Sequence, residues 1–172
     1  MIIREFKRDD FDSVYAIMEK SFPRDEHRPY GEQKALLDNR YYRIYLSTDD
    51  SGKIIAFIAV WQLDGVGYIE HFATDVDYRG QGIGVELLRE VTSRLKGRIC
   101  LEVEPPESDI TRRRIAFYER GGFCLNKYPY IQPPISQGHA PVPLMIMTYG
   151  NPISEEIFIK IRDLLYKEVY KV

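Results

Sequence analysis

Apolar positions near the start of the chain have first a strand-like and then a helical spacing. A short strand is predicted at Ile2 and Ile3. Asp9 or Asp10 is a suitable cap for the helix that follows, and this helix ends at Phe22-Pro23. Next come a polar loop over residues 24–30 and a short helix over residues 32–38. The side chains expected on the buried face of the first helix are Phe11, Val14, Tyr15 and Met18.

Three runs rich in β-branched and aromatic residues come next, over residues 41–47, 53–62 and 67–74. Short turns containing Asp and Gly separate them, at residues 49–52 and 64–65. Strands joined by such short turns pair antiparallel. We therefore predict a three-stranded antiparallel core for the sheet.

The second half of the chain alternates helical and strand-like spacing. Gly97 ends an amphipathic helix that begins near Gly84, and Ser154 caps a last amphipathic helix that continues to Tyr170. The stretch Gln132–Pro143 contains four prolines and is predicted to be a loop. The remaining predicted elements are a strand over 98–103, a helix over 110–120, and strands over 123–131 and 144–149.

This order of elements predicts a mixed α/β (α+β) fold. The connection from Tyr68 to Val103 is a strand–helix–strand crossover, which should give one parallel pair in a mostly antiparallel sheet with helices on both faces. We expect residues 1–150 to form the principal domain and residues 151–172 to be a helix appended to it. That helix would cover a sheet edge or contribute to a homodimer.

Composition narrows the possible partners. The 172 residues carry 24 basic and 26 acidic side chains, and this balance argues against a nucleic-acid-binding protein. The longest apolar run, Ile54–Trp61, is too short to span a membrane, and the charged start of the chain lacks a signal-peptide core. Cys100 and Cys124 are far apart, with no histidine at metal-ligand spacing. We expect free thiols, no metal and a cytoplasmic location.

The segment with the clearest chemistry is Arg79-Gly80-Gln81-Gly82-Ile83-Gly84, directly after a predicted strand and at the start of a helix. Glycine allows close backbone approach, and the first turn of a helix offers unpaired N–H groups, so the pattern predicts binding of phosphate or pyrophosphate. It matches neither a P-loop nor the dinucleotide fingerprint. The alternative is a glycine-rich helix start that binds nothing.

This segment resembles motif A of the GCN5-related N-acetyltransferase (GNAT) superfamily, Arg/Gln-x-x-Gly-x-Gly/Ala, at Arg79, Gly82 and Gly84. A second resemblance lies in the segment 115–123, which ends Tyr-Glu-Arg-Gly-Gly-Phe. The element order also follows that of the family. The resemblance implies the acyl-CoA N-acyltransferase fold and acetyl-CoA as cosubstrate, bound where two neighbouring strands, 67–74 and 98–103, splay apart.

The resemblance also assigns roles to residues. Phe72, Ala73 and Thr74 would pair with pantetheine, and the loop Arg79–Gly84 would bind the pyrophosphate. Tyr118 would protonate the leaving thiolate; the alternative is that it only packs on Phe123. Thr111 stands where the family often has the asparagine that contacts the pantetheine amide. Arg114, the last of three consecutive arginines, is a candidate for the CoA phosphates, although it could equally lie on a solvated face.

The base that accepts the amine proton stays open at this point. Glu70 lies on the strand that the family often uses, and Glu102 matches a strand glutamate that ribosomal-protein acetyltransferases use. Either could instead be a solvated strand residue, and His71 is a further candidate. A primary amine on a small molecule or peptide is the expected acceptor. The residues expected to bind it are Glu26, Tyr30, Tyr128 and Tyr130.

These residues leave more than one hypothesis of function. The favoured one is an acetyl-CoA-dependent N-acetyltransferase in which the amine attacks directly, without a covalent intermediate. The rival is a non-catalytic acyl-CoA-binding or sensing module, and a protein-interaction domain that binds no cofactor is a third possibility. The acid candidate Tyr118 favours the enzyme, because a sensor needs only the glycines.

Overall fold

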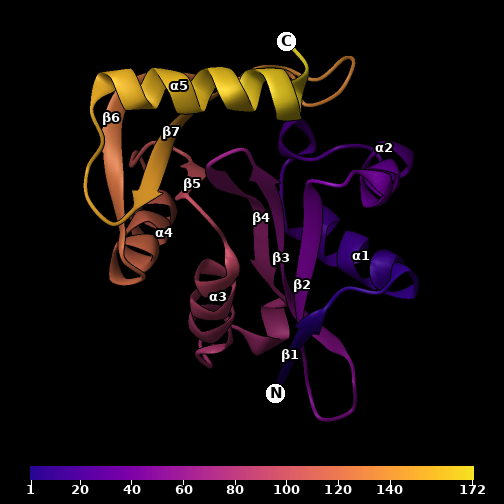
Figure 1. Ribbon diagram of the computed structural model, residues 1–172. Helices are drawn as coiled ribbons and strands as arrows, with labels where there is room; N and C mark the ends of the chain where they lie inside the picture. Colours follow the sequence, from indigo (N-terminus) through magenta and orange to yellow (C-terminus); the bar gives the residue numbers. More distant parts are fainter.

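Seven strands form one mixed sheet in the computed structural model, which describes residues 1–172 (Figure 1). Every neighbouring pair is antiparallel except β4 and β5, which are parallel. The predicted fold class is therefore confirmed. In spatial order the strands are β1 (Ile2–Glu5), β2 (Tyr42–Thr48), β3 (Ile54–Leu63), β4 (Val66–Thr74), β5 (Arg98–Val103), β7 (Val142–Tyr149) and β6 (Phe123–Gln132).

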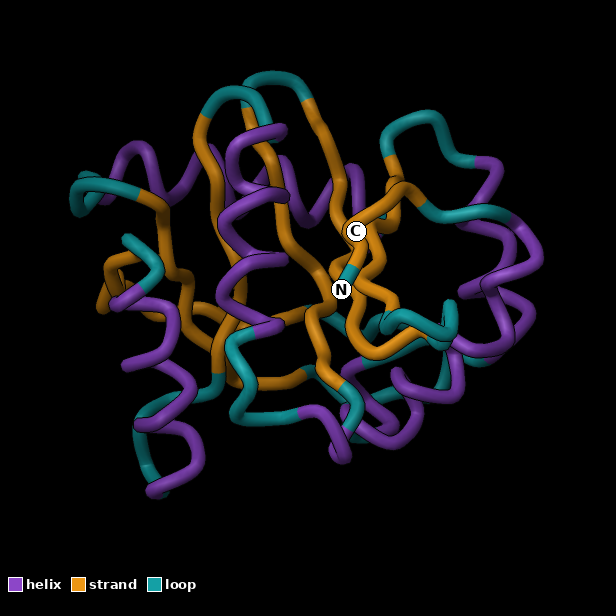
Figure 2. The backbone as a smooth tube through the Cα atoms, turned by 90° about the horizontal axis from the view of Figure 1, so that it is seen from below, coloured by secondary structure: helices purple, strands orange, loops and turns teal.

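Helices lie on both sides of the strands (Figure 2). The structure shortens three of the predicted helices, of which the one expected to be ended by Gly97 ends at Arg94. The short second helix ends at Ala35 and continues as a 3-10 turn over Leu36–Asp38, and the last helix ends at Leu165 and continues as a π turn over Tyr166–Tyr170. The five α-helices are α1 (Phe11–Ser21), α2 (Tyr30–Ala35), α3 (Ile83–Arg94), α4 (Asp109–Arg120) and α5 (Glu155–Leu165).

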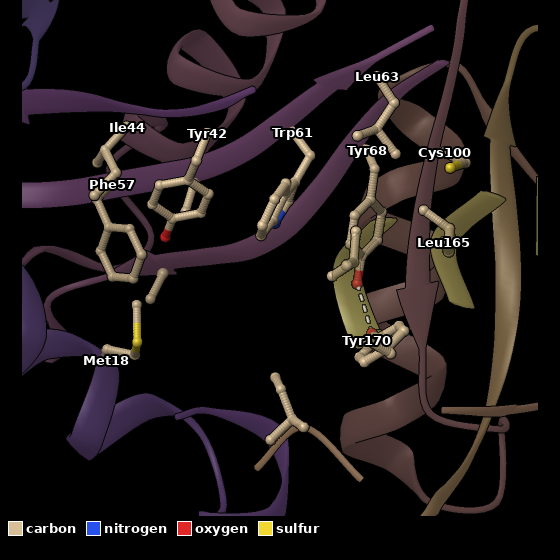
Figure 3. Close-up of a cluster of buried hydrophobic side chains, with 14 of the residues drawn as sticks. Met18, Tyr42, Ile44, Phe57, Trp61, Leu63, Tyr68, Cys100, Leu165 and Tyr170 are labelled. Carbon is tan, nitrogen blue, oxygen red and sulfur yellow. Dashed lines mark hydrogen bonds between the residues drawn. The ribbon is translucent and has the colours of Figure 1, made fainter. Parts of the chain in front are cut away.

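The central strand β3 is apolar from Ile54 to Trp61 because both of its faces are covered. Phe57, Ala59 and Trp61 point into the core shared with α1 and α5, whereas Ile58 and Val60 point into the core beneath α3 and α4. Figure 3 shows the first of these cores. Side chains of α5 and the turn after it, from Phe158 to Tyr170, belong to that same core.

The sheet divides between β4 and β5. Their parallel pairing runs from Val66↔Arg98 to Ile69↔Leu101 and then ends, although β4 continues to Thr74 and β5 to Val103. On their other sides both strands stay paired, β4 with β3 and β5 with β7. The backbone groups that β4 and β5 turn toward each other beyond this fork are therefore available to a ligand.

A β-bulge on β4 lies at the fork. Ala59 pairs with His71 and Val60 pairs with Ile69, so Glu70 is an extra residue with no partner on β3. The bulge reverses the alternation of side chains along β4. As a result Glu70 and His71, although consecutive, both contact the α1–α2 segment.

The loop between β6 and β7 reaches across the fork to the segment between α1 and α2, and we call this bridge the arch (Figure 1). Gln132 donates from Nε2 to the Asp25 carbonyl at 3.1 Å, and the Ala140 N–H donates to Asp25 Oδ1 at 3.0 Å. Ser136 Oγ donates to Glu32 Oε2 at 2.7 Å. The proline-rich loop is thus an ordered connection between the two halves of the divided sheet.

Candidate active site

A cleft of about 530 Å³ follows the fork between β4 and β5. Its walls come from both strands, from the glycine segment and α3, from α4, and from the end of α1 with the residues that follow it. Because Glu102 lies on the α5 side of the sheet and Tyr118 on the α3–α4 side, the cleft connects the two faces of the sheet. Two molecules that enter from opposite faces could meet there.

One end of the cleft is built for an anion. Gly80 and Gly82 have φ of +77° and +79°, which a residue with a side chain rarely adopts, and Gly82 precedes the first residue of α3. The first residues of that helix, from Ile83 to Val85, line the cleft, where their N–H groups have no partner within the helix. A side chain at Gly84 would come within 3.1 Å of the Phe72 ring. The local backbone therefore fits a phosphate group at the mouth of α3.

Tyr118 lies near the middle of the cleft. Ser108 caps α4 by accepting from the Thr111 N–H, and this helix carries Tyr118 three turns further on. The ring packs edge-on against Phe117 and Phe123, which fixes its direction, while its hydroxyl bonds to no other residue of the chain. Burial raises the pKa of Tyr118 to about 12, against a lowering effect of Arg114. The phenol is therefore protonated at neutral pH and able to donate.

Glu102 lies immediately beyond the last β4–β5 pair and is surrounded by phenols. Tyr170 donates to both carboxylate oxygens at 2.8 Å, and Tyr130 donates to Oε1. Burial raises the pKa of Glu102 to about 7, although hydrogen bonds from Tyr130, Tyr170 and Tyr68 lower it. A carboxylate that titrates near neutrality and lines a cleft can accept a proton at physiological pH.

Glu70 has a different environment. Its carboxylate lies 2.9 Å from the Arg28 guanidinium, and the two side chains are only 2% and 6% exposed. Burial alone would raise the pKa of Glu70, but Arg28 and His71 lower it below its ordinary value. The carboxylate is held ionised by its partners, which makes it a poor proton acceptor and a structural counter-ion for Arg28.

The opposite end of the cleft carries Glu26 and His71. His71 Nε2 lies 2.7 Å from the Glu26 carbonyl, which leaves the Glu26 side chain free to line the cleft. Burial and the nearby Glu104 carboxylate raise the pKa of Glu26. Glu104 itself is paired with Arg114 at 3.0 Å. This end of the cleft is therefore acidic and suits a cationic group.

The structure brings most of the predicted site residues together and leaves five outside. Gln81 is exposed in the loop, and the Thr111 hydroxyl is used in the cap of α4 by donating to the Ser108 carbonyl. Tyr30 packs against Phe11 and Tyr15. The predicted site residues on the cleft are Glu26, Glu70, Phe72, Ala73, Thr74, Arg79, Gly80, Gly82, Ile83, Gly84, Glu102, Arg114 and Tyr118.

Two of the expected acceptor residues, Tyr128 and Tyr130, lie below α5 rather than on the cleft. Tyr128 donates to the Ile153 carbonyl and its ring packs on Phe158, whereas Tyr130 is 5% exposed and donates to Glu102. Strand alternation points both toward the core that α5 covers. Tyr128 therefore packs below α5, and Tyr130 both packs there and bonds to Glu102.

Several residues of this region have no signal in the sequence. The polar pattern over residues 24–30 predicts a loop, yet Arg28 within it is buried against Glu70 and lies 6.0 Å from the Trp61 ring. Phe22 and Gln132 line the cleft from elements distant in sequence. A single basic residue in a loop gives no indication of burial, and only the fold places it beside its acidic partner.

The whole chain was also compared with the requirements of a metal site and of a membrane-spanning helix. No group of three or more His, Cys, Asp or Glu side chains is arranged to hold a metal ion. None of the helices combines the length and apolar character needed to cross a bilayer.

Comparison with known proteins relates this geometry to a family. The family model described as "Acetyltransferase (GNAT) family" matches residues 11–123. A solved structure from Bacteroides thetaiotaomicron, described as a candidate GNAT-family acetyltransferase, has a TM-score of 0.89 and 32% identity over 100% of this chain and 99% of that one.

Two more distant similarities complete the comparison. The Bacillus subtilis (strain 168) protein YjbC, described as a candidate acetyltransferase, is 31% identical over 63% of this chain. That match spans only 55% of YjbC. An aminoglycoside 6'-N-acetyltransferase solved with coenzyme A is 19% identical, covers 90% of this chain and 100% of its own, and has a TM-score of 0.61. At that identity the likeness concerns the fold alone.

Proposed function

We propose, since this chain belongs to the acetyltransferase (GNAT) family, that it transfers an acetyl group from acetyl-CoA to a primary amine by direct attack. One observation carries the proposal: a single cleft joins the anion-binding mouth of α3, the phenol of Tyr118 and the carboxylate of Glu102. The coenzyme A in the related aminoglycoside acetyltransferase supports the choice of donor.

The chain offers a matching set of contacts for acetyl-CoA. Phe72, Ala73 and Thr74 line the cleft beyond the last β4–β5 pair, and the backbone groups of this stretch that point away from β3 would pair with the pantetheine arm. The segment Gly80–Gly84, at the start of α3, would hold the pyrophosphate, with Arg79 beside it. Bound acetyl-CoA would supply the acyl group and a thiolate leaving group.

The side chains of the cleft then handle two protons. The amine nitrogen forms the new N–C bond while the C–S bond breaks, and the balance requires one proton to leave nitrogen and one to reach sulfur. Glu102 would accept the first, directly or through water, because its pKa is about 7. Tyr118 would donate the second from its hydroxyl, since burial keeps the phenol protonated.

The acceptor would enter from the face of the sheet that α1 and α5 cover, beneath the arch. Glu26 lines that end of the cleft, and its carboxylate would attract an ammonium group before the proton is lost.

The two cysteines are unpaired, and free thiols are typical of proteins in a reducing cytoplasm, which is the location we propose.

Thermal unfolding with and without acetyl-CoA tests the donor. A ligand at 100 times its Kd stabilises the folded state by about 2.7 kcal/mol, which raises Tm by roughly 5–11 °C in a chain of this size. Inorganic phosphate is the control for a non-specific anion. A rise with acetyl-CoA alone, followed by thiol release with a panel of primary amines, would support the proposal. No rise at saturation would refute it, and a rise without turnover for any amine would favour a sensing module.

A further inference from the structure

The C-terminal turn of the chain has an unusual backbone. After α5 the helix widens into a π turn, Tyr166–Tyr170, and Lys171 has φ +61°. π turns are rare, and a residue with a side chain seldom adopts a positive φ. The Val172 N–H closes the turn by donating to the Tyr166 carbonyl at 3.0 Å. This geometry turns Tyr170 inward, where it is 7% exposed.

Tyr170 reaches the fork of the sheet. Its hydroxyl lies 2.8 Å from both oxygens of Glu102. It also lies 3.0 Å from the hydroxyl of Tyr68, and Figure 3 shows this second contact. Tyr68 belongs to the last paired stretch of β4, and Glu102 is the first residue of β5 beyond that pairing. The end of the chain thus contacts both strands at the point where they separate.

We propose that Tyr170 is a positioning residue for acetyl transfer, and that the C-terminal turn exists to hold the Glu102 carboxylate ionised at the edge of the cleft. The inference rests on the proposed function, in which Glu102 accepts the proton of the amine. It adds a residue that lies outside the segment matched by the family model, residues 11–123.

The direction of the hydrogen bonds supports this role. A phenol has one proton, and an ionised carboxylate only accepts, so Tyr170 must donate to Glu102 and accept from Tyr68. Each such bond favours the charged form of the carboxylate, against the effect of burial. The ionisable groups that face Glu102 or interact with its charge are Tyr68 and Glu70 on β4, Cys100 on β5, Tyr130 on β6, and Tyr166 and Tyr170 in the turn.

Tyr170→Phe removes one hydroxyl and keeps the ring. A hydrogen bond to a charged group lost in this way should raise the pKa of Glu102 by about one unit. The acid limb of the kcat/KM profile would then move to higher pH by the same amount, with little change on the alkaline side. Tyr68→Phe removes a hydroxyl that bonds to Tyr170 and has a weaker lowering effect on the pKa of Glu102, so it should give a smaller shift in the same direction.

Tyr166→Phe is the matched control. This tyrosine belongs to the same turn, but its hydroxyl donates to the Ile131 carbonyl rather than to Glu102. The expected order of shifts is Tyr170→Phe, then Tyr68→Phe, with no shift for Tyr166→Phe. If Tyr170 served only to pack the core, the variants would change Tm and leave the acid limb in place.

A second measurement does not depend on turnover. NMR titration of ¹³C-labelled glutamate carboxyl groups, with Glu102 assigned from its absence in Glu102→Gln, reports the pKa of Glu102 in each variant. An unchanged pKa in Tyr170→Phe, or an equal shift in Tyr166→Phe, would overturn the inference even if the enzyme is active. A shifted pKa with an unmoved acid limb would also overturn it. Failure of the wild-type protein to bind acetyl-CoA would instead refute the proposed function.

Discussion

Glu70 and Arg28 form a buried ion pair whose disruption should be costly. The carboxylate and guanidinium are 2.9 Å apart, and their side chains are 2% and 6% exposed. Removal of one charge from such a pair leaves the other without a counter-ion, which costs about 3–5 kcal/mol of the free energy of unfolding. We expect Glu70→Gln to lose an amount in this range.

The double variant Arg28→Met with Glu70→Met separates the pair from its surroundings. Replacement of a buried ion pair by well-packed hydrophobic residues of similar volume is often neutral, so the double variant should recover most of the loss, to within about 1 kcal/mol of the wild type. Glu156→Gln is the control, because its ion pair with Lys160 is exposed, at 78% and 71%, and should cost less than about 0.5 kcal/mol.

Urea unfolding followed by tryptophan fluorescence measures these differences. The chain has one tryptophan, Trp61, and its ring lies 6.0 Å from the Arg28 guanidinium, so the probe reports on the site itself. A loss below about 1 kcal/mol in Glu70→Gln, or a double variant no more stable than the single one, would refute the reasoning. Thiol release should continue in folded Glu70→Gln. A drop in kcat of about 10²-fold without loss of stability would identify Glu70 as the base instead.

Four further tests address the rest of the site. Gly82→Asp should abolish acetyl-CoA binding measured by calorimetry, because φ is +79° and the new carboxylate would face the pyrophosphate. Gly52→Asp, at φ +86° in a distant turn, is the control and should bind acetyl-CoA normally. An equal loss of binding in both variants would contradict this prediction. Tyr118→Phe should keep binding and lower kcat by about 10²-fold; an unchanged kcat would restrict Tyr118 to packing. The wild-type kcat/KM should fall about tenfold per pH unit below 7, as Glu102 becomes protonated. The pKa of Glu102 in the folded state lies above the ordinary value of 4.5, so ionisation of this carboxyl destabilises the fold as pH rises from 4.5 to 7. Glu102→Gln should therefore be more stable than the wild type at about pH 8, and a lower stability of the variant would refute this direction of the effect.

Local sequence signals were sufficient for the sheet and for one end of the site. Short Asp-Gly turns predicted the antiparallel neighbours, and the glycine segment predicted the positive-φ backbone at the mouth of α3. These features are determined by residues close together in the chain. The position of Tyr118 on the cleft was expected from the resemblance of its segment to the family motif.

Features that depend on contacts between distant residues could not be predicted. The bulge at Glu70 places Glu70 and His71 on one side of β4, whereas regular alternation would separate them. The environment of Glu102 depends on three phenols that are distant in the sequence. Tyr68 lies 34 residues before Glu102, whereas Tyr130 and Tyr170 lie 28 and 68 residues after it. The sequence carries no mark of these contacts, because each tyrosine also fits an ordinary apolar core.

The fork between β4 and β5 gives this protein a sheet edge in its interior. At the outer edges β1 has only four residues, and β6 carries Pro129 in an irregular stretch, so neither offers a long template for another chain. Beyond the bulge at Glu70, residues 71–74 of β4 form an inner edge without a partner strand, and a short extended foreign segment could add to it. The arch, held at Asp25 by Gln132 and Ala140, crosses the acceptor end of this edge. A loop that crosses an inner sheet edge in this way would also limit the addition of a strand from another chain.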